Sequence, residues 1–194
     1  MIRIVGLGGT TKPRSSTEIA IKIALSAAQN VGANVELFDG DFLTNLPHYG
    51  TAQACESEIA RLFIAAVREA DGLIIASPGY HGSISGLVKN AIDYLEETSR
   101  DDRIYLEGLP IGLIATAYGW QATGSTLAAL RSIAHALRGW PTPLGATIRT
   151  GPGVFEGDRC IDPSVQSQLE LVGQQVVQFA RLGSERPAMA ETRA

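Results

Sequence analysis

Short apolar segments alternate along this chain with segments whose apolar residues recur at helical spacing. Such alternation, with short links, is typical of a parallel sheet with helices on both faces and right-handed crossovers. Apolar runs rich in Val, Ile and Leu fit strands buried on both sides. The pattern therefore predicts an α/β fold, a doubly wound five-stranded parallel sheet in the order 2-1-3-4-5. The expected strands are residues 2–7, 33–38, 72–76, 110–116 and 143–148.

Local signals place the helices between these strands. The first helix is expected to begin at Ser15, because Ser15 and Glu18 have capping-box spacing, and to end at Gly32. The later helices are expected over residues 54–70, 86–97, 126–137 and 163–182, with connections over 39–51, 98–108, 117–125 and 149–162. In the 54–70 helix the inward-facing residues are predicted to be Ile59, Leu62, Phe63, Ala66 and Val67.

Composition restricts the class of protein. The chain has 194 residues, 45% apolar and 19% charged, enough for one sizeable core. We expect a single domain over residues 1–182 and a flexible tail over 183–194. The net charge of −4 gives no reason to expect binding to nucleic acid or to an anionic membrane surface. No apolar run is long enough to span a bilayer.

The N-terminus and the cysteines bear on location. The first residues enter a strand directly, so we expect no signal peptide. Cys55 and Cys160 are the two cysteines, far apart in the sequence and in no CxxC pair. We therefore expect no disulfide framework, and we expect a cytoplasmic location.

The loop over residues 9–17 follows the first strand and opens the first helix. Helix N-termini leave free N–H groups and a partial positive charge, and so they receive phosphate. Two cations, Lys12 and Arg14, stand here among dense hydroxyls, which predicts a monophosphate cradle. The alternative is an N-capped surface loop with incidental charges. The hydroxyl residues are Thr10, Thr11, Ser15, Ser16 and Thr17.

Two other phosphate motifs fail. Gly6 and Gly8 begin like the dinucleotide fingerprint, but Thr11 stands where its third glycine belongs. Residues 119–126 have Walker-A spacing, but Ser125 replaces the essential lysine.

The loop after the third strand offers backbone amides, an aromatic ring and small residues. In an open parallel sheet, ligands lie where such loops leave the carboxyl ends of the strands. We expect this loop to run along the edge of a flat heterocycle and to hydrogen-bond to its ring atoms. Ser83 or Ser85 is expected to cap the following helix. The loop consists of Pro78, Gly79, Tyr80, His81, Gly82 and Ser83.

A third loop, over residues 117–125, carries Tyr118, Gly119 and Trp120. Its aromatic residues can wall a ring pocket, cover a subunit interface or pack on their own domain. The three histidines, His48, His81 and His135, have no metal-ligand spacing, so no metal site is expected. Nothing indicates a Cys–His nucleophilic pair.

Residues 9–17 and 78–93 resemble the NAD(P)H-dependent FMN reductase family, and the resemblance extends from residue 1 to about residue 182. The second motif is specific, whereas the first has Lys12 where the family usually has Arg. The resemblance implies a flavodoxin-like fold that binds FMN non-covalently. It places the phosphate on Thr10, Lys12, Ser15, Ser16 and Thr17, the ring edge on Pro78, Gly79, Tyr80, His81 and Ser83, and Tyr118 and Gly119 beside the flavin.

The resemblance also implies an enzyme. NADPH or NADH would pass a hydride to flavin N5, and the electrons would go on to free flavin, a quinone or a similar acceptor. No side chain is assigned a catalytic role, because the cofactor carries the reaction. The family commonly forms dimers or dimers of dimers, so a homodimer or homotetramer is expected.

Two alternatives use the same fold. One is a flavodoxin-like electron carrier, against which Lys12 and Arg14 count, because flavodoxin phosphate loops rely on hydroxyls and amides. The other is a flavin-based redox sensor without steady NAD(P)H turnover. A preference for NADPH needs a positive group near the ribose 2′-phosphate, and the candidates are Arg103, Arg149 and Arg159.

Overall fold

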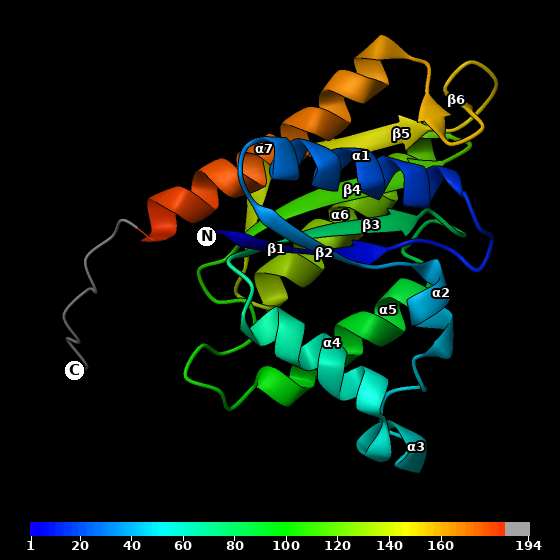
Figure 1. Ribbon diagram of the computed structural model, residues 1–194. Helices are drawn as coiled ribbons and strands as arrows, with labels where there is room; N and C mark the ends of the chain where they lie inside the picture. The colour runs from blue at the N-terminus through cyan, green and yellow to red at the C-terminus, as the bar shows by residue number, and fades with distance from the viewer. Residues whose placement is uncertain (185–194) are drawn as a thin grey trace.

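A computed structural model describes residues 1–184 of the chain. Its centre is a parallel sheet with the strand order β2-β1-β3-β4-β5 (Figure 1), which confirms the predicted order. Because every pair is parallel, the carboxyl ends of the strands meet at one edge, on the right in Figure 1. The strands are β1 (Arg3–Gly8), β2 (Asn34–Phe38), β3 (Gly72–Pro78), β4 (Pro110–Ala117) and β5 (Trp140–Arg149).

Helices cover both faces of the sheet (Figure 1). On one face lie α1 (Ser16–Asn30) and α7 (Pro163–Ser184). On the other lie α4 (Glu58–Arg68), α5 (Gly86–Asp93) with its 3-10 extension η1 (Tyr94–Thr98), and α6 (Trp120–Ala136). Two apolar cores result, one on each face, and every residue of β3 is buried between them. The doubly wound architecture is therefore confirmed.

Short elements occupy segments that were predicted to be connections. These are α2 (Gly40–Asn45), β6 (Phe155–Glu156) and β7 (Arg159–Cys160), whereas α3 (Ala52–Glu56) forms where the 54–70 helix was predicted to begin. The α2 helix forms because the Asp39 carboxylate accepts the N–H groups of Asp41 and Phe42, both at 3.1 Å. This side-chain cap offsets part of the unfavourable free energy of helix nucleation. The helix was not predicted because the segment is too short to show a helical period.

The predicted 54–70 helix is divided at Ser57, which ends α3 and caps α4 by accepting the Ala60 N–H at 3.3 Å. After this break the buried stripe of α4 runs through Ala60, Phe63, Ile64 and Val67. The prediction that Leu62 faces inward is wrong, since 64% of Leu62 is exposed. Leu62 precedes Phe63 by about 100° of helix rotation, which places its side chain outside the stripe.

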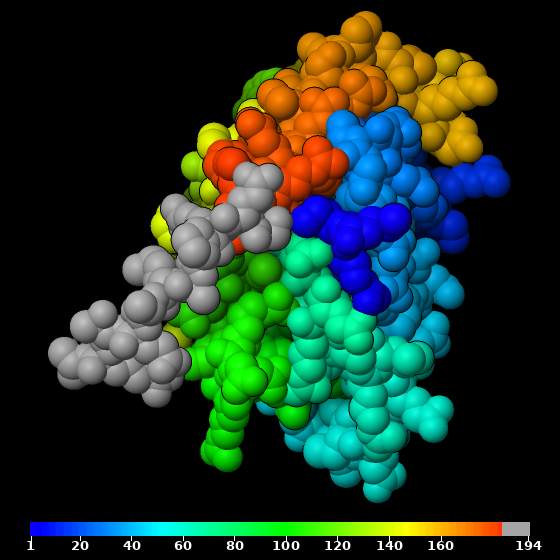
Figure 2. All heavy atoms as spheres, turned by 60° about the vertical axis from the view of Figure 1, so that its left-hand side comes forward, coloured from blue at the N-terminus to red at the C-terminus, as the bar shows by residue number. Residues whose placement is uncertain are grey.

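Two helix boundaries also differ from prediction. The α6 helix begins at Trp120 rather than at Thr126, so the third loop is shortened to Tyr118 and Gly119. The α7 helix continues through Ser184, and the rest of the predicted tail, 185–194, lies outside the described residues. Figure 2 shows the opposite, amino-terminal edge of the sheet, where the first residues reach the surface close to the end of α7.

Arg103 holds the C-terminal end of α4. Its guanidinium donates to the carbonyl oxygens of Val67 and Ala70 at 2.7 Å and of Arg68 at 2.8 Å. Burial lowers the pKa of this guanidinium, although the nearby carboxylates of Asp71 and Asp101 favour its charged form. The candidate role of Arg103 beside a ribose phosphate is therefore dropped, because its donors are used inside the protein.

We expect Arg103→Ala to lower the free energy of unfolding by about 1–3 kcal/mol, because half-buried carbonyl oxygens lose their donors. Urea denaturation followed by circular dichroism measures this loss. The exposed Arg100 on the same connection is the control, and Arg100→Ala is expected to change stability by less than about 0.5 kcal/mol. Equal losses in the two variants would show that the Arg103 contacts do not stabilise the fold.

Candidate functional site

Three loops leave neighbouring strands at the carboxyl edge of the sheet. β1 ends beside β3, with Gly8 opposite Ala76, and β3 ends beside β4, with Pro78 opposite Thr116. The loops over residues 9–15, 79–85 and 118–119 are therefore gathered at one edge. Since chain connections run outward in opposite directions from β1 and β3, this is the switch point where open α/β sheets bind ligands.

The first loop ends in an uncovered helix N-terminus. The Ser15 hydroxyl accepts the Glu18 N–H at 3.2 Å, and the Ser15 carbonyl accepts the Ile19 N–H at 2.9 Å, which confirms the predicted start of α1. The capping box is only half formed, because the Glu18 carboxylate accepts the Arg14 N–H at 3.0 Å. The N–H groups of Ser16 and Thr17 point out of the first turn with no partner inside the helix.

Two cations flank this N-terminus. Lys12 and Arg14 are exposed, and within residues 1–184 neither side chain forms an ion pair. The Thr10 hydroxyl accepts the Lys12 N–H at 3.1 Å, which folds the loop back on itself. Free amides, hydroxyls and unpaired cations at one helix end are the donor set that suits a phosphate.

Thr17 differs from the other predicted phosphate ligands. Only 2% of it is exposed, and its hydroxyl lies 2.6 Å from the hydroxyl of Thr116 at the end of β4. Its side chain is therefore bonded inside the protein, and what Thr17 offers at the surface of the cradle is its backbone N–H.

The second loop is a tight reverse turn. Tyr80 and Ser83 exchange backbone hydrogen bonds of 3.0 and 3.2 Å, and the residues between them, His81 and Gly82, have φ of 52° and 87°. Two successive positive φ angles define a type I′ turn. Pro78 is buried, whereas Tyr80, His81 and Ser83 are exposed.

Hydrogen bonds within the protein use most amides of this loop. The Gly79 N–H bonds to the Thr116 carbonyl at 2.7 Å, and the Ser85 N–H to the Ser77 hydroxyl at 3.0 Å. Within the described residues the N–H groups of His81 and Gly82 have no partner. Gly82 was not among the predicted ligands, and a glycine at the second position of a two-residue turn, where φ is positive, is the sequence signal that would have found it. Of the two predicted caps, Ser85 caps α5, with its hydroxyl accepting the Val88 N–H at 3.2 Å.

The third loop is short and open. Tyr118 is 88% exposed and Trp120 is 63% exposed, so neither ring is buried in the core of its own domain. The Arg149 guanidinium, at the end of β5, lies over the Trp120 ring at 5.6 Å from its centroid. A pocket wall and a subunit interface remain the two roles for these rings.

Thr116 and Gly40 support the site but were missed by sequence reasoning. Thr116 is the last residue but one of β4, where the sequence shows only a strand residue. A Cβ added at Gly40 would lie 1.9 Å from the Thr10 carbonyl oxygen, so α2 begins in backbone contact with the first loop. A glycine directly after the Asp39 cap is the sequence signal for such close approach.

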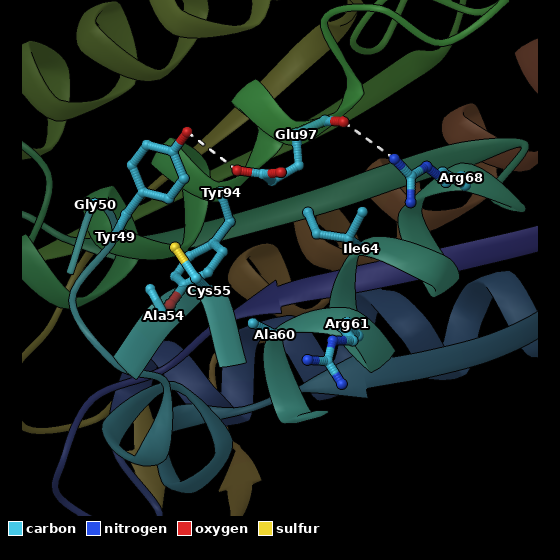
Figure 3. Close-up of a pocket in the computed structure, with 10 residues that line it drawn as sticks. All are labelled: Tyr49, Gly50, Ala54, Cys55, Ala60, Arg61, Ile64, Arg68, Tyr94 and Glu97. Carbon is cyan, nitrogen blue, oxygen red and sulfur yellow. Dashed lines mark hydrogen bonds between the residues drawn. The ribbon is translucent and has the colours of Figure 1, made fainter. Parts of the chain in front are cut away.

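A separate cavity of about 600 Å³ lies among α3, α4 and η1 (Figure 3). The Tyr49 hydroxyl bonds to the Glu97 carboxylate at 3.3 Å, and Arg68 bonds to the Glu97 carbonyl oxygen at 3.0 Å. Burial, followed by the negative charge of Glu97, raises the pKa of Tyr49. None of the residues that line this cavity is a predicted cofactor ligand.

In the part of the chain that the structure describes, the remaining cysteine and metal-binding residue types do not gather into a further site. Burial raises the pKa of the Cys160 thiol, which bonds to the Asp162 carbonyl at 3.4 Å, so this thiol is held in its unreactive form. Among residues 1–184 no three His, Cys, Asp or Glu side chains gather where they can share a metal ion. None of the described helices combines the length and the apolar character needed to cross a membrane.

Comparison with known proteins gives the following matches. Residues 2–152 match the family described as NADPH-dependent FMN reductase. An FMN-dependent NADPH-azoreductase of Staphylococcus haemolyticus is 29% identical over 139 residues, covering 70% of each chain. A protein of the same description from Staphylococcus saprophyticus is 41% identical over 76 residues, which span 39% of this chain and 37% of the relative. That second match thus covers little more than a third of the relative's length.

Solved structures share the fold. A flavoenzyme NAD(P)H:(acceptor) oxidoreductase from Paracoccus denitrificans superposes with a TM-score of 0.74 at 18% identity, covering 94% of this chain and 99% of that one. The apo form of an NADH:FMN oxidoreductase gives 0.74 at 19% identity, covering 97% and 93%. A flavodoxin-type WrbA-like protein from Agrobacterium tumefaciens gives 0.64 at 16% identity, covering 94% and 99%. The fold is flavodoxin-like, as predicted.

Proposed function

The chain belongs to the NADPH-dependent FMN reductase family, and on this premise we propose that it is an FMN-dependent oxidoreductase that uses NADPH or NADH as hydride donor. The family match agrees with the resemblance predicted from residues 9–17 and 78–93. One structural observation carries the proposal: the N-terminus of α1, with two cations that have no ion-pair partner within residues 1–184, lies beside a turn whose tip amides are likewise unpartnered there, at the switch point of the sheet. No described feature specifically favours the electron-carrier or sensor alternative.

FMN fits the donor set at both ends of this site. Its phosphate would lie on the N–H groups of Ser16 and Thr17, with the hydroxyls of Thr10 and Ser15 and the ammonium of Lys12 around it. Its ring edge would lie along residues 78–83, where His81 and Gly82 present free N–H groups. We propose Tyr118 and Gly119 as residues beside the ring, as the sequence predicted.

The protein's contribution is position and electrostatics. Bound FMN supplies a ring that accepts hydride from a nicotinamide and delivers electrons to an acceptor. The amides of the His81–Gly82 turn are donors held in place by the flanking Tyr80–Ser83 bonds, so they can stabilise negative charge at the ring edge without rearranging. No described side chain is required as a general acid or base.

A binding experiment tests the proposal. We expect the purified protein to bind added FMN. The visible absorbance of the bound FMN should be lost when NADPH is added without oxygen, and it should return when air or a quinone is added. Failure to bind FMN would overturn the proposal. Binding without bleaching by either nicotinamide would favour the carrier or sensor.

The phosphate end has its own prediction. Lys12→Ala is expected to weaken FMN binding about tenfold, the effect of one lost charge-assisted contact. Affinity for riboflavin, which has no phosphate, should change little. Fluorescence titration measures both affinities, and Arg100→Ala is the control because it removes an equal charge far from the loop. Equal losses for FMN and riboflavin would place Lys12 elsewhere in the site.

Further properties are proposed with this function. The names of the azoreductase relatives support an azo compound, beside quinones and free flavin, as an acceptor to test. The exposed rings of Tyr118 and Trp120 support a homodimer or homotetramer, which light scattering would measure. The free thiols of Cys55 and Cys160 support a cytoplasmic location, and we keep residues 1–182 as the single FMN-binding domain.

A further inference from the structure

Buried hydroxyl groups are concentrated at the carboxyl edge of the sheet. Six of the buried polar residues lie beside the three loops of the proposed site, and each is a serine or threonine. No described buried side-chain oxygen or nitrogen lacks a hydrogen-bond partner. The six are Thr17, Ser77, Ser85, Thr116, Thr123 and Thr126. Such satisfied buried networks fix the elements that they join.

One of these residues joins two of the loops. The Thr116 hydroxyl lies 2.6 Å from the Thr17 hydroxyl, across 99 positions of sequence, and so ties β4 to the first turn of α1. The Thr116 carbonyl accepts the Gly79 N–H at 2.7 Å, and so ties β4 to the start of the second loop. β4 is an interior strand, paired with β3 and β5. Thr116 is therefore a rigid anchor for the first turn of α1 and for the start of the second loop.

We propose that Thr116 is a positioning residue that sets the N-terminus of α1, and with it the phosphate cradle, relative to the loop for the flavin ring. This inference rests on the proposed function. Thr17 then acts through Thr116: its hydroxyl locates the helix end whose free N–H groups face the phosphate, and does not itself bind the ligand.

Burial supports this assignment over direct contact. Thr17 is 2% exposed and Thr116 is 3% exposed, so neither hydroxyl reaches the surface of the cradle. Ser15 and Ser16, in contrast, are half-buried and lie at the open end of the helix. A ligand that is held at both its phosphate and its ring binds best when the two loops lie at a matching separation, so displacement of either loop weakens binding.

Valine substitutions test the pair, because valine has the shape of threonine without its hydroxyl. The variants are Thr17→Val, Thr116→Val and the double variant, with Thr17→Ser as the variant that keeps the hydroxyl. Dissociation constants are measured for FMN and for riboflavin. We expect each single valine to weaken FMN about tenfold and riboflavin less than about twofold, since the Thr116 carbonyl still holds Gly79.

The double variant shows whether Thr17 and Thr116 affect FMN binding through the one contact between them or through separate contacts with the ligand. It is expected to bind FMN no more weakly than the weaker single variant, because both singles break the same contact. Thr17→Ser should retain FMN affinity. If Thr116→Val binds FMN as tightly as the wild type, or if the two losses add, the inference is overturned and the proposed function stands. If the wild type binds no FMN, both are overturned.

Thr142→Val is the matched control for a purely structural role. Thr142 is a buried threonine of β5, and its hydroxyl donates to the Leu144 carbonyl at 3.3 Å, far from the carboxyl edge. This variant should lower the urea midpoint and leave FMN affinity unchanged. If it weakened FMN as much as Thr116→Val does, the effect of Thr116 would be one of general stability and the inference would be wrong.

Discussion

Adding one methyl group at Gly173 is expected to lower the free energy of unfolding by about 3 kcal/mol. A Cβ at this position of α7 would lie 1.9 Å from the Ala24 carbonyl oxygen and 3.1 Å from the Ala28 nitrogen, both in the backbone of α1. Backbone atoms within a helix cannot turn aside as a flexible side chain can, so α1 and α7 must separate. The gain of about 1 kcal/mol in helix propensity from Gly to Ala offsets only part of this cost.

Gly183→Ala is the control for Gly173→Ala, because Gly183 lies in the same helix and a Cβ there meets no described atom within 4 Å outside its own helix turn. This control is expected to be neutral or slightly stabilising. Urea unfolding followed by circular dichroism compares the two variants. Similar stability in both would mean that α1 and α7 do not pack backbone to backbone at Gly173.

The order of the sheet was predictable because its signals are local and repeated. Each strand is a short apolar run, and the covering helices have one apolar face, so alternation alone fixes the layers. The start of α1 was predictable for a similar reason, since Ser15 accepts the N–H of Glu18 within its own turn. Predictions of this kind need no knowledge of residues far along the chain.

The start of α6 was not predictable, because local propensity and the tertiary structure disagree there. Gly124 and the residues around it are poor helix formers and indicate a loop. In the fold, Thr123 and Thr126 are fully buried, and the Thr126 hydroxyl bonds to the Ser83 carbonyl at 3.3 Å. The Thr123 hydroxyl bonds to the Trp120 carbonyl at 2.9 Å within the first turn, and the helix begins at Trp120. Leu62 was misassigned because the apolar residues of α4 fit more than one stripe at helical spacing, and the packed stripe includes Ala60 and Ile64 in its place.

The residues of the site were predictable as types and less so in their roles. The sequence indicated a cluster of hydroxyls and cations after the first strand, but it did not show which hydroxyls face outward. Thr17 is turned inward by a partner 99 positions away. The amides of His81 and Gly82 lie at the tip of a turn that the Tyr80–Ser83 backbone bonds close, and they have no partner among the described residues. Such assignments need the long-range contacts of the folded chain.

Gly40→Ala is expected to weaken FMN binding about a hundredfold. Its Cβ would lie 1.9 Å from the Thr10 carbonyl oxygen and 2.8 Å from the Thr10 nitrogen, so Thr10 must move, and the Lys12 backbone bonded to it moves as well. Overpacking of about 3 kcal/mol, if it is relieved by displacing the loop, corresponds to about two orders of magnitude in affinity. Fluorescence titration with FMN and with riboflavin measures the effect, and the loss should be the greater for FMN.

Two comparisons make the Gly40 result interpretable. The urea midpoint of Gly40→Ala shows whether the variant is folded under the conditions of the titration, and Gly183→Ala shows the effect of a methyl group added in open space at the opposite edge. A folded Gly40→Ala that binds FMN like the wild type would mean that Thr10 and Lys12 are not ligands, because no displacement of their loop could then matter. A loss shared equally by FMN and riboflavin would instead place the damage at the loop over residues 78–83, although the atoms nearest to a Cβ at Gly40 all belong to Thr10.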